Sequence, residues 1–298
     1  MTIQSLRTTN QPASITSAAL RTATRLAWAT SVLALVAALW TFVDPGLLHG
    51  PEAMQGSARG TALVLGGLAV PVLLGSVWWA RQGSREALVL WAGALLHVIY
   101  NAVLFLFLTP FNAAFLLYVA LLGTALWATG YLLPAPETRR VGRQVAKRAP
   151  VRGIATYVWV VAALNALAWL AVVIPSLRAF PTPLLEGTGV QTNAIYVQDL
   201  GIWLPLAAVG AHWLRRREAR GAVVIGAVLG LWVIESVSIA VDQWFGVRAD
   251  PASTVVSLSV IPPFALLAVV GTVPLWLLLR HLPSRPRDGL TRRGAPGA

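Results

Sequence analysis

The sequence has no cysteine and only one lysine among its 298 residues. Without cysteine this chain can form no disulfide, thiolate nucleophile or sulfur-ligated zinc or iron–sulfur centre. The single lysine, Lys147, lies in a basic stretch, which excludes a retinal Schiff base, because that linkage needs a lysine inside the helical bundle. There is also no phosphate-binding loop with lysine, no His/Glu zinc motif, no Gly-x-Ser-x-Gly elbow and no run of gating arginines. We therefore expect no metal and no cofactor, and the enzyme and channel classes that carry these motifs are unsupported.

Charged residues are scarce as well, at 11% of the chain against 57% apolar residues. An ordinary globular domain has about 25% charged residues, so this chain has too few charged residues to cover the water-exposed surface of a soluble protein of its size. Lipid must cover most of it.

Seven uncharged or nearly uncharged runs are long enough for membrane spans, since a helix needs about 20 apolar residues to cross a bilayer. The longest run, 87–136, must turn back once, and Thr109-Pro110-Phe111-Asn112 supplies the break because proline cannot continue a helix. The sequence thus predicts an all-α integral membrane bundle of eight transmembrane helices. The first run is long for a signal-peptide core and no small-x-small cleavage pattern follows it, so we expect it to be retained. The runs are 26–43, 60–80, 87–136, 153–177, 187–214, 221–247 and 251–279.

The basic residues indicate the orientation. The net charge is +12, but the arginines cluster between apolar runs, which is typical of loops flanking membrane spans and not of nucleic-acid binding. With both termini inside, all but three of the 23 basic residues (Arg59, Arg178 and Arg248) lie on the cytoplasmic side, as the positive-inside rule predicts. We expect anionic inner-leaflet lipids to be the partners of this charge, and no nucleic acid.

A basic cytoplasmic linker, 134–152, divides the chain into two predicted four-helix halves, 24–133 and 153–281. The halves look alike, since Trp79-Ala-Arg-Gln-Gly-Ser-Arg resembles Trp213-Leu-Arg-Arg-Arg-Glu-Ala-Arg. A parallel duplication would explain this, because an even number of spans preserves orientation. Chance alignment of apolar helices is the alternative. We expect the polar tails, 1–23 and 282–298, to be disordered in the cytoplasm.

Few ionisable side chains fall inside the predicted spans, and each is a functional candidate because a buried charge is costly in lipid. Glu235, Ser238 and Asp242 recur at i, i+3 and i+7 in the seventh span, so they share one face of the helix. This stripe indicates a proton or cation path, or a polar pocket that opens outward. A structural hydrogen bond between helices, with an uncharged Glu235, is the alternative, and Asp242 could already lie among lipid headgroups.

The third span carries His97, Tyr100 and Asn101 near mid-membrane, again on one face. A lone histidine is most often a satisfied packing residue, but a buried imidazole must find a partner. Glu235 lies at a similar predicted depth. A His97–Glu235 contact would form an acid–base pair or a proton relay.

Asp199 opens the sixth predicted span, where a carboxylate complements the positive end of the helix dipole, so we interpret it first as a capping residue. Asn165, with Trp169 one turn on, suggests an interhelical hydrogen bond. Gly226-x-x-x-Gly230 predicts close helix packing. The half-apolar loop 179–195 is either a lid over the outer mouth of the bundle or an unstructured connector.

Two further segments are distinctive, namely Phe111-Asn-Ala-Ala-Phe-Leu-Leu-Tyr-Val-Ala-Leu-Leu-Gly and Asn193-Ala-Ile-Tyr-Val-Gln-Asp-Leu-Gly-Ile-Trp-Leu-Pro. Both resemble segments of a group of bacterial polytopic membrane proteins to which no activity is assigned. The resemblance covers the third to the seventh span through moderately specific motifs. It implies a protein of the bacterial cytoplasmic membrane, and it favours roles beyond packing for Asn112, Tyr118, Tyr196 and Asp199.

The leading hypothesis is an outward-facing polar pocket between the third, sixth and seventh spans, which moves or senses a small solute or protons. One alternative is a non-catalytic membrane subunit or scaffold that binds another membrane protein. Another is a membrane-embedded enzyme acting on a lipid-soluble substrate, with His97 and Glu235 as general acid and base. The substrate and the oligomeric state stay open. The candidate pocket residues are His97, Tyr100, Asn101, Asp199, Glu235, Ser238 and Asp242.

Overall fold

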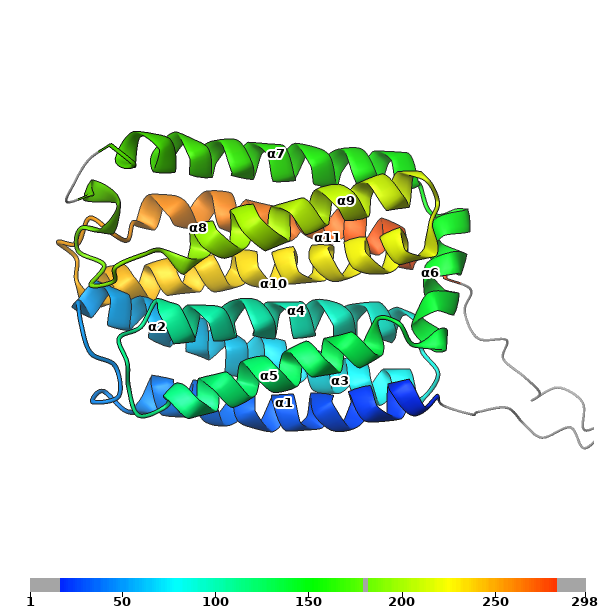
Figure 1. The fold of residues 1–298 in the computed structure, drawn as a ribbon, viewed down its shortest axis with the longest axis horizontal. Coiled ribbons are helices and arrows are strands. Elements are labelled where there is room, and N and C mark those ends of the chain that lie inside the picture. Colours follow the sequence, from blue (N-terminus) through cyan, green and yellow to red (C-terminus); the bar gives the residue numbers. More distant parts are fainter. Residues whose placement is uncertain (1–16, 179–181, 283–298) are drawn as a thin grey trace, which may run out of the picture.

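The computed structural model describes residues 17–178 and 182–282, and this part of the chain is all-helical, without strands. Eight of its helical segments are long and apolar enough to cross a membrane. Figure 1 shows them running side by side along one axis, as in a membrane bundle. The predicted all-α fold with eight candidate spans is confirmed. The predicted disordered tails lie mostly outside the described residues.

The first four spans use five α-helices and one π-helical turn. Helix α1 is Ala18–Val43, and it begins earlier than the predicted residue 24 because Ser17 caps it, accepting the backbone N–H of Leu20 at 3.2 Å. The second span is continuous and consists of α2 (Glu52–Val64), the π-helical turn η1 (Leu65–Ala69) and α3 (Val70–Arg81). The third and fourth spans are α4 (Glu86–Phe107) and α5 (Phe115–Leu132), on either side of the predicted break.

The last four spans follow a similar plan. The fifth is α7 (Val151–Ser176), and the sixth consists of α8 (Ala194–Gln198), the π-helical turn η3 (Asp199–Trp203) and α9 (Leu204–Arg215). The seventh is α10 (Ala219–Ala249), and the eighth joins a short 3₁₀ turn, η4 (Leu258–Val260), to α11 (Ile261–Leu279). Another 3₁₀ turn, η2 (Pro183–Leu185), lies in the loop before α8.

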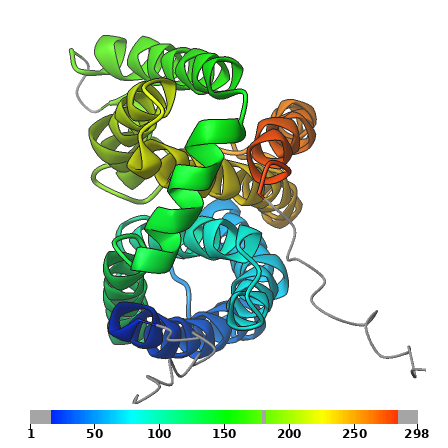
Figure 2. The same ribbon diagram turned by 90° about the vertical axis from the view of Figure 1, so that its right-hand side faces the viewer.

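The predicted linker contains a helix of its own, α6 (Pro136–Arg148), which lies across one end of the bundle (Figures 1 and 2). Its small and apolar residues are buried against the bundle, and a Cβ on Gly142 would collide with the carbonyl oxygen of Ala219. Its basic side chains are exposed. The sequence analysis did not predict this helix, because the many charged residues mask a helical repeat of buried positions: Thr138, Val141, Gly142, Val145 and Ala146.

Helix α6 is tied to the start of α1 by two hydrogen bonds. The backbone N–H and the hydroxyl of Ser17 each donate to a carboxylate oxygen of Glu137 at 2.8 Å. Burial alone would raise the pKa of Glu137, but these two hydrogen bonds, a third from its own backbone and the positive charge of Arg140 together hold the pKa below its ordinary value.

The helices form two groups, and α10 joins them. Figure 2, viewed from the α6 end, shows α1–α5 in one ring and α7–α11 in another. Helix α10 packs on α2 and α4 of the first group and on α9 and α11 of its own. Glycines bring backbones into contact here: a Cβ on Gly60 would lie 2.6 Å from Cα of Asp242, and one on Gly93 would lie 2.9 Å from Cα of Gly230. The close packing predicted at Gly226-x-x-x-Gly230 is therefore present. We call these contacts of α2 and α4 with α10 the glycine seam.

The second span of each group shares its local structure. A π-helical turn is followed by a proline in the first turn of the next helix, Pro71 or Pro205. The second residue after each span has a positive φ, which is 89° at Gly83 and 58° at Arg217. The same interval of 134 residues separates the two prolines and the two residues with positive φ. A π-helical turn widens the helix locally and is often found at functional sites, and η3 begins with Asp199.

Candidate functional site

Helices α4 and α10 bring a histidine, an asparagine and a glutamate together at the glycine seam. His97 Nδ1 lies 3.0 Å from Glu235 Oε2, and Asn101 Nδ2 donates to the same oxygen at 2.8 Å. The side chains of His97 and Asn101 are fully buried. This approach is possible because Gly93 and Gly230, about one turn earlier on each helix, let the backbones touch. The predicted contact between His97 and Glu235 is present.

Glu235 also faces a cavity of about 370 Å³, which we call the central cavity. Its Oε2 atom is held by α4, but Oε1 makes no hydrogen bond to the described residues. The side chain is 10% exposed, so this oxygen is open to the cavity. Ser236 and Asp242 of α10 and Asp199 of η3 supply further polar groups. The other walls are aliphatic and aromatic, and the aromatic residues are Tyr100, Tyr157, Trp169, Trp203, Trp232 and Phe264.

Asp199 lines the central cavity and does not cap a helix. The cap of α8 is Asn193, whose side chain accepts the backbone N–H of Ile195 at 2.9 Å. Asp199 lies past the first turn, where Trp169 Nε1 of α7 donates to its Oδ2 at 2.8 Å. The capping interpretation was wrong because the helix begins earlier than the local sequence suggested. Asp199 instead holds α7 against η3.

Two other predictions for polar residues in the spans need correction. Asn165 lines the central cavity, but its buried carbonyl oxygen has no partner, so it does not make the expected interhelical hydrogen bond. Ser238 is fully buried, its hydroxyl has no partner among the described residues, and it does not line the central cavity. The residues of α10 that line the central cavity include both ends of the stripe, Glu235 and Asp242; the others are Leu229, Leu231, Trp232, Ser236, Ile239 and Gln243. The two ends of the predicted polar stripe, Glu235 and Asp242, therefore line the cavity, and its middle residue, Ser238, does not.

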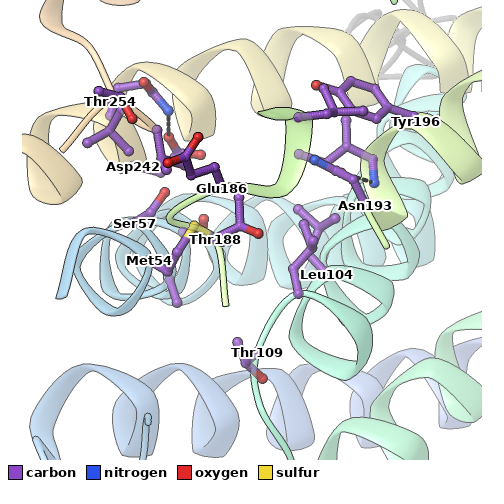
Figure 3. Close-up of a pocket in the computed structure, with 18 of the residues that line it drawn as sticks. Met54, Ser57, Leu104, Thr109, Glu186, Thr188, Asn193, Tyr196, Asp242 and Thr254 are labelled. Carbon is purple, nitrogen blue, oxygen red and sulfur yellow. Dashed lines mark hydrogen bonds between the residues drawn. The ribbon is translucent and has the colours of Figure 1, made fainter. Parts of the chain in front are cut away.

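A second cavity, of about 520 Å³, lies at the end of the bundle away from α6, and we call it the distal cavity. Asp242 and Gln243 line both cavities, so the two adjoin there. Figure 3 shows Asp242 of α10 with Ser57 of α2 and with Glu186 and Thr188 of the loop before α8. The described part of that loop walls the distal cavity, which favours the lid over the unstructured connector.

Both cavities are acidic. No basic residue lines either of them, whereas Asp199 and Glu235 line the central cavity, Glu186 the distal cavity and Asp242 both. Within residues 17–178 and 182–282, no group of three or more His, Cys, Asp or Glu side chains is placed to hold a metal ion. This lining suits protons, cations and hydrogen-bond donors.

The resemblance favoured roles beyond packing for three further residues, and the structure places them at three different locations. Asn112 organises the turn between α4 and α5, accepting the backbone N–H of Ala114 at 3.0 Å. Tyr118 lies inside the first ring, 2.9 Å from the hydroxyl of Thr41. Tyr196 lines the distal cavity. Sequence reasoning gave no role in the pocket to Gln243, and only its position one residue after Asp242 pointed to it.

Comparison of the chain with known protein families, with curated proteins and with solved structures finds no match.

Proposed function

We propose that this chain is a multi-pass protein of the bacterial cytoplasmic membrane that binds a small solute in the central cavity and moves it in exchange for protons. The α6 end, with its basic clusters, would face the cytoplasm by the positive-inside rule, together with both ends of the chain. The distal cavity would then open to the outside. The equal spacing of the π-helical turns, prolines and helix ends supports a parallel duplication of the two halves.

One observation carries this proposal: the two carboxylate oxygens of Glu235 have different surroundings. One oxygen is held by His97 and Asn101, and the other is free on the cavity side. A proton on Glu235 and a solute hydrogen-bonded to Glu235 therefore compete for the same carboxylate. Two ligands that compete in this way are thermodynamically linked, so binding of either one promotes release of the other.

His97 gives the released proton a place to go. It contacts Glu235 directly but lines neither cavity, so a solute does not reach it. This separation favours proton exchange over catalysis, because a general acid or base must come within hydrogen-bonding distance of a reacting atom. The enzyme hypothesis is accordingly less well supported than transport.

The test uses purified protein in liposomes that contain the pH-sensitive dye pyranine and have an acidic interior. Amino acids, sugars, carboxylic acids and quaternary ammonium ions are added outside in turn, with protein-free liposomes as the blank. We expect at least one solute class to collapse the pH gradient, and Glu235→Gln to abolish the response. Glu86→Gln, the same change at the α6 end, should respond like the wild type. The proposal fails if no solute collapses the gradient or if Glu235→Gln responds normally.

A membrane scaffold is the second candidate, favoured by the lipid-facing character of α7 and α11, whose spans are each only 11% buried. It predicts that Glu235→Gln has no effect on flux, and that a specific partner co-purifies with the wild-type chain but not with variants carrying polar substitutions on α7.

A further inference from the structure

The central cavity combines acidic groups with an aromatic wall. Glu235 is buried and turns one unpartnered oxygen into the cavity, and Asp242 stands where the cavity meets the distal one. Trp203 and Trp232 are among the aromatic side chains around them. Aromatic faces attract cations, most strongly where both are removed from water. A cavity with acids, aromatic faces and no basic group is selective for positive charge.

The size and apolar character of the walls argue against a small hydrated ion. Most of the lining side chains are aliphatic or aromatic, and such a surface gains nothing from a ligand that keeps its water shell. An anion would meet the carboxylates without a compensating positive charge. The chemistry that satisfies the whole lining is an organic cation with an apolar body.

The ring of the second group is open on one side. Helices α7 and α11 barely contact each other, whereas α1 and α5, their counterparts in the first group, pack closely (Figure 2). Residues of both helices nevertheless line the central cavity, among them Asn165 of α7 and Leu267 of α11. Leu267 is 38% exposed, so the same side chain faces both the cavity and the surroundings of the bundle. The two helices come together near Tyr157, whose hydroxyl would lie 3.8 Å from a Cβ on Gly271.

We propose that the central cavity binds a lipophilic organic cation that enters from the lipid between α7 and α11 and places its charge at Glu235. This inference rests on the proposed function and names the solute class. Entry from the lipid explains why the cavity is walled by α7 and α11 at all, since these two helices are otherwise the least buried of the bundle. A lipophilic cation partitions into the membrane, so its concentration at this opening exceeds that in water.

Charge selectivity is tested with two ions of the same shape and opposite sign, tetraphenylphosphonium and tetraphenylborate. Each is titrated separately into purified protein by calorimetry, with detergent alone as the blank, and tetrapropylammonium provides a smaller cation. We expect saturable binding of at least one cation and none of tetraphenylborate. Glu235→Gln should weaken cation binding by roughly tenfold or more, as loss of one partner of a buried charge contact does. Asp242→Asn should weaken it as well.

The entry route is tested with two neighbouring substitutions on α11. Leu267→Trp fills the opening, and Leu266→Trp adds the same bulk to a side chain that is 62% exposed and does not line the central cavity. In liposomes, Leu267→Trp should slow the binding of tetraphenylphosphonium several-fold, and Leu266→Trp should not. Equal rates in the two variants would overturn lateral entry.

The outcomes separate this inference from the proposed function. If neither cation binds, or if tetraphenylborate binds as tightly, the cation assignment is wrong, whereas proton-linked flux of another solute would leave the proposed function standing. If the cations bind at Glu235 but collapse no pH gradient, the assignment holds and the proposed proton exchange fails. Gel filtration and thermal unfolding of each variant show whether a loss of binding reflects a loss of fold.

Discussion

The substitution Gly93→Ala tests the glycine seam that holds the site together. The added methyl group would lie 2.9 Å from Cα of Gly230 and 3.2 Å from the carbonyl oxygen of Ala227. Carbon atoms in contact prefer a separation of about 3.5–4.0 Å. Both neighbours are backbone atoms, so no side chain can rotate away, and α4 and α10 must move apart.

The size of the effect follows from two opposing contributions. Overpacking of a well-packed interior costs about 1–3 kcal/mol, and replacing a mid-helix glycine with alanine recovers about 0.5–1 kcal/mol. The difference centres on about 1 kcal/mol, so we expect Gly93→Ala to lower the free energy of unfolding by about that amount, which is a factor of about 5 in the unfolding equilibrium.

The matched control is Gly123→Ala in α5, where an added Cβ has no atom within 4 Å. This change should leave stability unchanged or raise it by about 0.5–1 kcal/mol. Both variants are measured by reversible unfolding in mixed micelles of dodecylmaltoside and sodium dodecyl sulfate, followed by circular dichroism. If Gly93→Ala is as stable as Gly123→Ala, the two backbones do not touch, and the position of His97 beside Glu235 loses its explanation.

Three further predictions concern the site and α6. Asn101→Ala removes a donor to Glu235 Oε2 and should cost about 1–3 kcal/mol in the same unfolding assay, and wild-type stability would contradict that hydrogen bond. Because the pKa of Glu137 is lowered in the folded chain, its contribution to stability is complete above the ordinary value of 4.5 and is lost as the pH falls through the folded value. The melting temperature of the wild type should therefore drop over this pH range, and that of Glu137→Gln should lack this drop. A drop of equal size in the variant would refute the reasoning. Since the chain has no cysteine, a single cysteine can be introduced for labelling without first removing others. Ser57→Cys in the distal cavity should react about tenfold faster with a trimethylammonium thiosulfonate than with its anionic sulfonate counterpart, because the cavity is acidic. Ser238→Cys should react with neither, and rapid labelling there would show that the cavities are wrongly placed.

Some features of this protein could be predicted from short stretches of sequence. The eight candidate spans and the break near Pro110 follow from local hydrophobicity and from the geometry of proline, and both are found in the structure. The contact of His97 with Glu235 was predicted from depth alone, because two lone polar groups at one level in lipid have few other partners. Charge density was a poorer guide at 134–152, where exposed arginines hid the helical repeat of α6.

The sequence by itself determined that most of this chain is suited to lipid, how many apolar segments it has and which polar residues lie within them. Each of these features depends on the composition of a contiguous stretch. Only the tertiary structure decided what these residues do. In the folded protein Asp199 accepts a hydrogen bond from Trp169, the hydroxyl of Ser238 has no partner in the described part of the chain, and one oxygen of Glu235 faces the central cavity. Those outcomes depend on the rotation and separation of helices far apart in the chain, which are set by backbone contacts at glycines such as Gly93, and no local pattern encodes the partner that such a glycine will meet.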